Sequence, residues 1–141
     1  MAALQKFNHF SEQLCLAKYK FDTYAFRLAL TNTAPSATMT KWVSGAGGEV
    51  TSTANGYPSG GGVLAVGMSL TGATTKVTCA DYTFTATGAW DPFRYGVIFC
   101  AEDPANKWVV GWFDHGASIT LAAGETFKAD FDAANGIFTL A

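Results

Sequence analysis

The feature that most constrains this chain is a series of short apolar segments separated by turn residues. From residue 63 onward they follow one another at roughly the 8–12-residue spacing of all-β folds, without intervening helical periodicity. Gly, Asn, Asp and Pro, which favour turns, fall between most of them. The pattern predicts an all-β, jelly-roll-like β-sandwich. We expect its strands at 63–70, 74–80, 81–87, 94–100, 107–114, 117–121, 126–132 and 136–140.

The region before residue 31 combines two different periodicities. Residues 3–18 have the spacing of one short amphipathic helix, with Phe7, Phe10 and Leu14 on its apolar face. This face packs either on its own domain or on a partner. Residues 24–30 then alternate with period two, which predicts a half-buried strand.

The size of the chain fits one domain. Its 141 residues divide into an N-terminal helix or arm at 1–20 and a β-sandwich body at 21–141. Charged residues make up only 14%, against about 25% in an average domain. This shortage of charge, with many aromatic residues, indicates an apolar surface that meets a partner. The alternative is a tightly packed monomer with a Thr, Ser and Gly surface.

Several function classes are disfavoured by the residue content. The net charge is −2 and the Lys and Arg residues are scattered, so we expect no direct contact with nucleic acid. Apolar runs are too short for a membrane span or a signal peptide, which predicts a soluble protein made in the cytoplasm, without membrane contact. Three widely spaced Cys and two His predict neither a disulfide framework nor a metal site. We expect no cofactor.

One group of residues has the composition of a hydrolase triad. Asp114 and His115 lie close to Ser118, but Ser118 is not within a G-x-S-x-G sequence. We therefore interpret 114–116 as a turn and expect no catalytic residue. A small jelly-roll enzyme is therefore the least favoured functional hypothesis, behind the two given at the end of this section.

Three further segments carry specific expectations. Residues 97–100 and 108–113 are apolar on both faces, which makes their strands candidates for the most buried pair. The long loop at 44–62, which contains Tyr57, is typical of a functional segment or of one ordered only in a complex. Residues 90–95 hold Trp, Phe, Arg and Tyr, which are either interface residues or a cap on the core.

Several segments give the chain a resemblance to a known family. These are Phe7-Asn8-His9-Phe10, Leu28–Pro35, Asn55-Gly56-Tyr57, Phe84–Gly88, Phe93-Arg94-Tyr95, Gly111–Gly116, Gly124–Phe127, Asp130-Phe131-Asp132 and Gly136–Ala141. Together they resemble capsid cement (decoration) proteins of tailed bacteriophages. The resemblance implies a jelly-roll-like body that forms a homodimer on the outer capsid surface of the virion and bridges neighbouring major capsid proteins.

We therefore expect a non-enzymatic capsid cement protein whose partners are the major capsid protein and a second copy of itself. The alternative is a tail or fibre-associated virion protein that binds a host glycan through exposed aromatic rings. The residues expected at the protein interface are Phe7, Phe10, Leu14, Tyr57, Trp90, Phe93, Arg94 and Tyr95.

Overall fold

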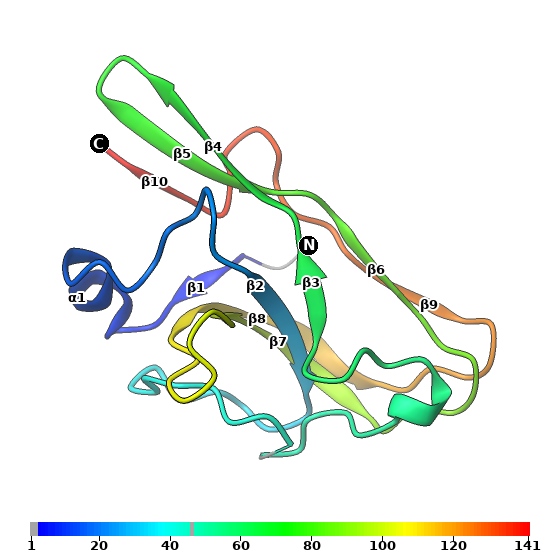
Figure 1. The fold of residues 1–141 in the computed structure, drawn as a ribbon. Coiled ribbons are helices and arrows are strands. Elements are labelled where there is room, and N and C mark those ends of the chain that lie inside the picture. The colour runs from blue at the N-terminus through cyan, green and yellow to red at the C-terminus, as the bar shows by residue number, and fades with distance from the viewer. Residues whose placement is uncertain (1–2, 46) are drawn as a thin grey trace.

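The computed structural model describes residues 3–45 and 47–141, and it is built almost entirely of antiparallel strands (Figure 1). The described part has one α-helix, α1 (Phe10–Cys15), and one 3-10 helix, η1 (Thr53–Asn55). The prediction of an all-β fold is confirmed. The strands are β1 (Gln5–Lys6), β2 (Phe26–Thr31), β3 (Gly62–Leu64), β4 (Val66–Thr71), β5 (Thr74–Cys79), β6 (Tyr82–Thr85), β7 (Phe93–Cys100), β8 (Val109–Ile119), β9 (Thr126–Ala129) and β10 (Phe138–Leu140).

The main sheet has the strand order β1-β8-β7-β2-β3. Its central strand β7 is buried from Gly96 to Cys100, as the apolar sequence of this segment predicts. The expected partner in the most buried pair was β8. Instead β2 is the more deeply buried neighbour, because the second half of β8 runs out to solvent.

Both faces of the main sheet are covered. One face joins the principal core through Leu28 and Ile98, and the other packs a smaller cluster around Ala29, Val97 and Phe99. The smaller cluster is completed by side chains from the N-terminal segment and from the loop after β2. The half-buried strand expected at 24–30 is therefore buried on both faces over Leu28–Thr31.

A second layer lies across the principal face of the main sheet. The chain passes from β5 almost directly into β6, and the return path through β9 and β10 pairs with both (Figure 1). The result is a two-strand ribbon, β6-β9, followed by a three-strand sheet of order β10-β5-β4. Val77, Phe84 and Phe127 from this layer share one core with Leu28 and Ile98 of the main sheet.

The N-terminal helix is shorter than its sequence predicts. Helix α1 has six residues, and Gln5–Lys6 instead form β1, which pairs antiparallel with the edge of β8. Phe7 then enters the smaller cluster, where its ring lies 4.6 Å from that of Trp112. A helix over this segment and a strand that ends at Phe7 would both place Phe7 and Phe10 inward. The strand is favoured because Gln5–Lys6 can pair with the open edge of β8.

Two other expectations are corrected. The segment around His115 is not a turn between strands but part of the continuous strand β8. An irregularity in its pairing with β7 accommodates Gly116, whose φ is +97° and whose N–H donates to Asp114 at 2.8 Å. The expected strand at 126–132 ends at Ala129, because Asp132 caps a turn by accepting the N–H groups of Ala134 and Asn135.

The long loop at 44–62 packs on the body of its own chain. Of this segment the structure describes 44–45 and 47–62. Tyr57 is buried, and its hydroxyl accepts the Leu30 N–H at 3.1 Å and donates to Glu49 at 3.1 Å. Thr51 also donates to Asp91 through its backbone N–H and its hydroxyl. These intrachain contacts order the described part of the loop without a partner.

Candidate functional site

Most of the aromatic residues expected at an interface lie inside the chain. Phe7, Phe10, Tyr57, Trp90 and Phe93 are each at most 4% exposed. Their rings pack against other aromatic rings of the two cores, so their surface is already removed from water. In this conformation these five side chains are not available to a partner, and the predicted interface narrows to Leu14, Arg94 and Tyr95.

The segment at 90–95 therefore divides into a buried and an exposed part. Trp90 donates its indole N–H to the Asn55 carbonyl at 2.7 Å and caps the core. Arg94 makes a bidentate pair with Asp114, with distances of 2.7 and 2.9 Å, and lies over the ring of Tyr95. The hydrogen bond from Arg94 lowers the pKa of Asp114. Arg94 and Tyr95 are only partly exposed.

Leu14 borders an apolar groove between α1 and β10. The groove has a volume of about 360 Å³. In its wall the rings of Phe10 and Phe138 meet edge to face, with centroids 5.2 Å apart. Of the described residues that line this groove, Lys6 alone is charged, and its ammonium group donates to the Ser11 hydroxyl at 2.7 Å. The lining residues are Leu4, Lys6, Phe10, Ser11, Leu14, Cys15, Val110, Ile137, Phe138, Thr139 and Leu140.

The sheet β10-β5-β4 extends beyond the body above this groove, and we call it the overhang (Figure 1). Residues directly opposite one another in a sheet share a face. Near the body Met68, Val77 and Phe138 form one such row, and the next row outward is Leu70, Thr75 and Leu140. Because Val77 is buried in the principal core, this is the inner face of the overhang.

The inner face is apolar well past the point where the body ends beneath it. On this face exposure is 2% at Val77 on β5, 49% at Met68 opposite it on β4, and 70% at Leu70 in the next row outward, and Leu140 on β10 is 58% exposed. Met68, Leu70 and Leu140 are three of the six large hydrophobic side chains that are exposed among the described residues. The overhang thus gathers half of them on one small sheet.

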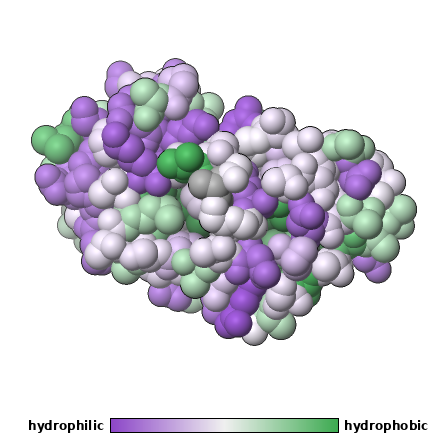
Figure 2. Space-filling model, turned by 90° about the horizontal axis from the view of Figure 1, so that it is seen from below, coloured by the Kyte–Doolittle hydropathy of each residue, from purple (hydrophilic) through white to green (hydrophobic). Residues whose placement is uncertain are grey.

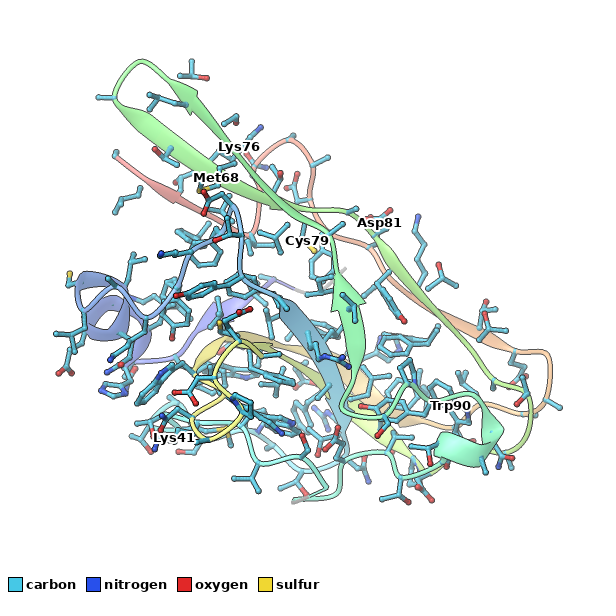
Figure 3. All side chains as sticks on the ribbon, in the orientation of Figure 1. Lys41, Met68, Lys76, Cys79, Asp81 and Trp90 are labelled. Carbon is cyan, nitrogen blue, oxygen red and sulfur yellow. The ribbon has the colours of Figure 1, made fainter. Side chains whose placement is uncertain are left out.

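The outer face of the overhang has the opposite character. Its central row is Ser69, Lys76 and Thr139. Met68 and Lys76 lie on opposite sides of the sheet (Figure 3). Lys76 donates to the carbonyls of Ala133 and Ala134, which belong to the turn before β10. The overhang is therefore an amphipathic sheet whose apolar inner face extends beyond the core on which it packs.

The face of the molecule away from the overhang looks different. Seen from below, it is a mixture of hydrophilic and hydrophobic residues, with the hydrophobic ones in small, separated patches (Figure 2). Scattered apolar residues of this kind are ordinary on soluble proteins, whereas a concentrated apolar face marks an interaction site. The groove and the inner face of the overhang together form the candidate docking surface.

Comparisons with protein-family models, with curated proteins and with solved structures find no match to this chain. Within residues 3–45 and 47–141, no three His, Cys, Asp or Glu side chains are grouped so that they could hold a metal ion. None of the helices in the same part of the chain is long and apolar enough to cross a membrane.

The exposed part of the docking surface is absent from the residues that the sequence predicts at an interface. Met68, Leu70 and Leu140 are ordinary aliphatic residues within predicted strands, and their spacing resembles that of buried positions elsewhere. One signal was available, because residues 66–71 alternate between apolar and small side chains and contain no charge. An alternating strand of this kind shows which face is apolar but not where the core beneath it ends.

Proposed function

We propose that this chain is a structural virion protein that binds the outer surface of a phage capsid and cements neighbouring major capsid subunits. The observation that carries the proposal is the apolar inner face of the overhang, which continues into the groove beside α1. Such a surface is suited to burial against another polypeptide. The resemblance of the sequence to cement proteins, which implies a jelly-roll-like body and a location on the capsid exterior, supports the major capsid protein as that polypeptide.

The proposed mechanism is thermodynamic linkage. A protein that binds the assembled shell, but not loosened subunits, stabilises the shell by about 2.7 kcal/mol per site when its free concentration is a hundred times its Kd. A stable contact of this type buries roughly 1,200–2,000 Å² in total. A dimer that binds two sites on the shell has a higher overall affinity, because the second subunit binds at a high effective concentration once the first is attached. No chemical step is required in this mechanism.

The glycan-binding alternative loses its proposed platform. Stacking on a sugar requires ring faces that solvent can reach, and of the three rings expected to supply them Trp90 and Phe93 are buried. Tyr95 alone is half-exposed, and its ring lies beside Arg94.

The test is the heat stability of shells of the phage that encodes the chain, measured with and without added protein. We expect added protein to raise the temperature at which the shells disrupt. Leu140→Asp places a charge in the groove and should abolish the increase, because burying an unpaired carboxylate is costly. Val43→Asp changes an equally exposed apolar residue outside the docking surface and serves as the matched control. Equal disruption temperatures with and without the protein would reject the cementing role.

A further inference from the structure

The outer edge of β4 presents unused backbone groups. In the sheet order β10-β5-β4, none of the described strands pairs with this edge. The N–H of Ala80 donates to the carbonyl of Ala65 at 2.9 Å, so these two opposite residues form a hydrogen-bonded pair. Hydrogen-bonded and non-hydrogen-bonded pairs alternate along an antiparallel hairpin, which determines the direction of each backbone group in β4. Gly67, Ser69 and Thr71 accordingly direct their N–H and C=O groups toward β5. Val66, Met68 and Leu70 direct theirs outward.

This edge lacks the features that usually prevent strands from pairing. Natural edge strands are protected by charged side chains, by Pro, by bulges or by a covering segment. The sequence Val66–Thr71 contains neither a charge nor a Pro, and its register with β5 is continuous over all six residues. Residues 68–71 are exposed. The chemistry of the edge therefore fits an extended, uncharged strand.

The strand β4 is itself such a partner. If two copies pair antiparallel about a twofold axis at Met68, Val66 of one copy lies opposite Leu70 of the other, and the two Met68 residues face each other. Every outward N–H and C=O of these three residues then has a partner. The side chains that meet on the inner face are all apolar, and those on the outer face are Gly67 and Ser69. No like charges are opposed, so no electrostatic penalty arises.

The same arrangement removes the exposed end of the overhang from solvent. Because the strands are antiparallel, the tip of one hairpin lies beside the body-proximal end of the other. Leu70, which extends past its own core, comes to lie against Val66 of the second copy, which packs on the second core. The inner faces of the two overhangs become one continuous apolar surface.

We propose that a second copy of this chain is the partner of the β4 edge, and that the two copies pair antiparallel about a twofold axis at Met68. This inference rests on the proposed function and deepens it by naming the strand edge through which the protein dimerises. The groove between α1 and β10 lies at the other edge of the overhang and stays free for a shell. The pairing is tested in solution without any shell, so its failure and that of the cementing role are distinguishable.

The first measurement is the mass of the purified chain by sedimentation. We expect twice the 14.9 kDa of one chain at micromolar concentration. Met68→Glu brings two carboxylates together at the axis and should return the monomer mass. Thr139→Glu adds the same charge on the outer face of the other edge, beside Lys76, and should leave the dimer intact. A monomeric wild-type chain, or a Met68→Glu variant that stays dimeric, would overturn the proposal.

The second measurement fixes the register. In a Cys15→Ser background, which removes the exposed thiol, Met68→Cys places two thiols opposite each other at a separation that suits a disulfide. We expect a covalent dimer under mild oxidation. Leu70→Cys faces Val66 of the second copy and should not cross-link. Cross-linking at 70 and not at 68 would show that the chains pair in a different register, and the proposed axis would be wrong.

Discussion

The ribbon β6-β9 and the overhang are neighbouring parts of one layer, yet one is a finished part of the core and the other is not. In the ribbon, Phe84 and Phe127 lie opposite each other and are both buried. In the overhang, Leu70 and Leu140 occupy one row on either side of Thr75 and are both more than half exposed. Both pairs belong to apolar faces of antiparallel strands.

The difference between the two regions is what lies beneath them. Beneath the ribbon, the Tyr57 ring of the loop at 44–62 stacks 6.0 Å from that of Phe84, and the Phe93 ring of β7 lies 5.1 Å from that of Phe127. The part of the chain described here has no corresponding segment under the tip of the overhang. The comparison teaches that an alternating strand specifies an apolar face, whereas the surrounding chain decides whether that face becomes core or contact surface.

The largest effect expected from this comparison is the difference between two truncations. Phe84→Ala removes a side chain that is 1% exposed and should cost about 3–5 kcal/mol of unfolding free energy. Leu70→Ala removes a side chain that is 70% exposed and should change the stability of the monomer by no more than about 0.5 kcal/mol. Denaturant unfolding of both variants in the monomeric Met68→Glu background checks this. Equal losses would show that the overhang is part of the core.

A smaller effect is expected where the loop is tied to the body. Tyr57→Phe removes the hydroxyl that links Leu30 to Glu49 and leaves buried polar groups without a partner. We expect a loss of about 1–3 kcal/mol in unfolding free energy. Burial raises the pKa of Tyr57, so the hydroxyl stays a donor throughout the ordinary pH range and the loss should not vary between pH 6 and 9. Unchanged stability would contradict the role given to this link.

The smallest effect concerns Asp81, at the junction between ribbon and overhang. Its carboxylate accepts from Lys128 at 2.9 Å and from the Phe131 N–H at 2.8 Å. The hydrogen bond with Lys128 is the main reason that the pKa of Asp81 lies below the ordinary value of an aspartate. A carboxyl group whose pKa is lower in the folded than in the unfolded state stabilises the fold at any pH above its unfolded-state pKa. This contribution is lost as the pH falls through the folded-state pKa.

Asp81→Asn should therefore be slightly less stable than wild type at pH 7, and the difference should vanish in strong acid. Lys128→Gln removes the other member of the pair and is expected to give the same profile. Unfolding free energies measured from pH 7 to pH 2 would reveal it. A difference that does not change with pH would mean that the charge of Asp81 plays no part.

The sequence predicted the strands well because their periodicity is local information. Alternation and turn residues located β4 to β7 within a few residues, and the apolar run at 97–100 marked the buried centre of the main sheet. The segment 3–18 was predicted less well. Phe7 and Phe10 satisfy a helical and a mixed strand-helix conformation equally, and the choice depends on the distant edge of β8.

The candidate site was harder to predict for a related reason. Trp90 and Phe93 have the residue types of interface anchors, but large rings also stabilise a core most, and only the packing of distant segments distinguishes the two. Met68 and Leu70 were overlooked because nothing local shows that the body ends beneath them. Of the predicted contact residues, two line the groove of the docking surface, the half-buried Leu14 and the buried Phe10.

The most direct test of the exposed β4 edge of the overhang is backbone hydrogen exchange, measured on the dilute monomer and on the dimer paired through β4. The account predicts that the amides of Val66, Met68 and Leu70 exchange rapidly in the dilute chain and become protected on assembly. Those of β6 should be protected in both states. Exchange in β4 that is equally slow in the dilute chain, or equally fast after assembly, would contradict the claim that the overhang is a surface awaiting another polypeptide.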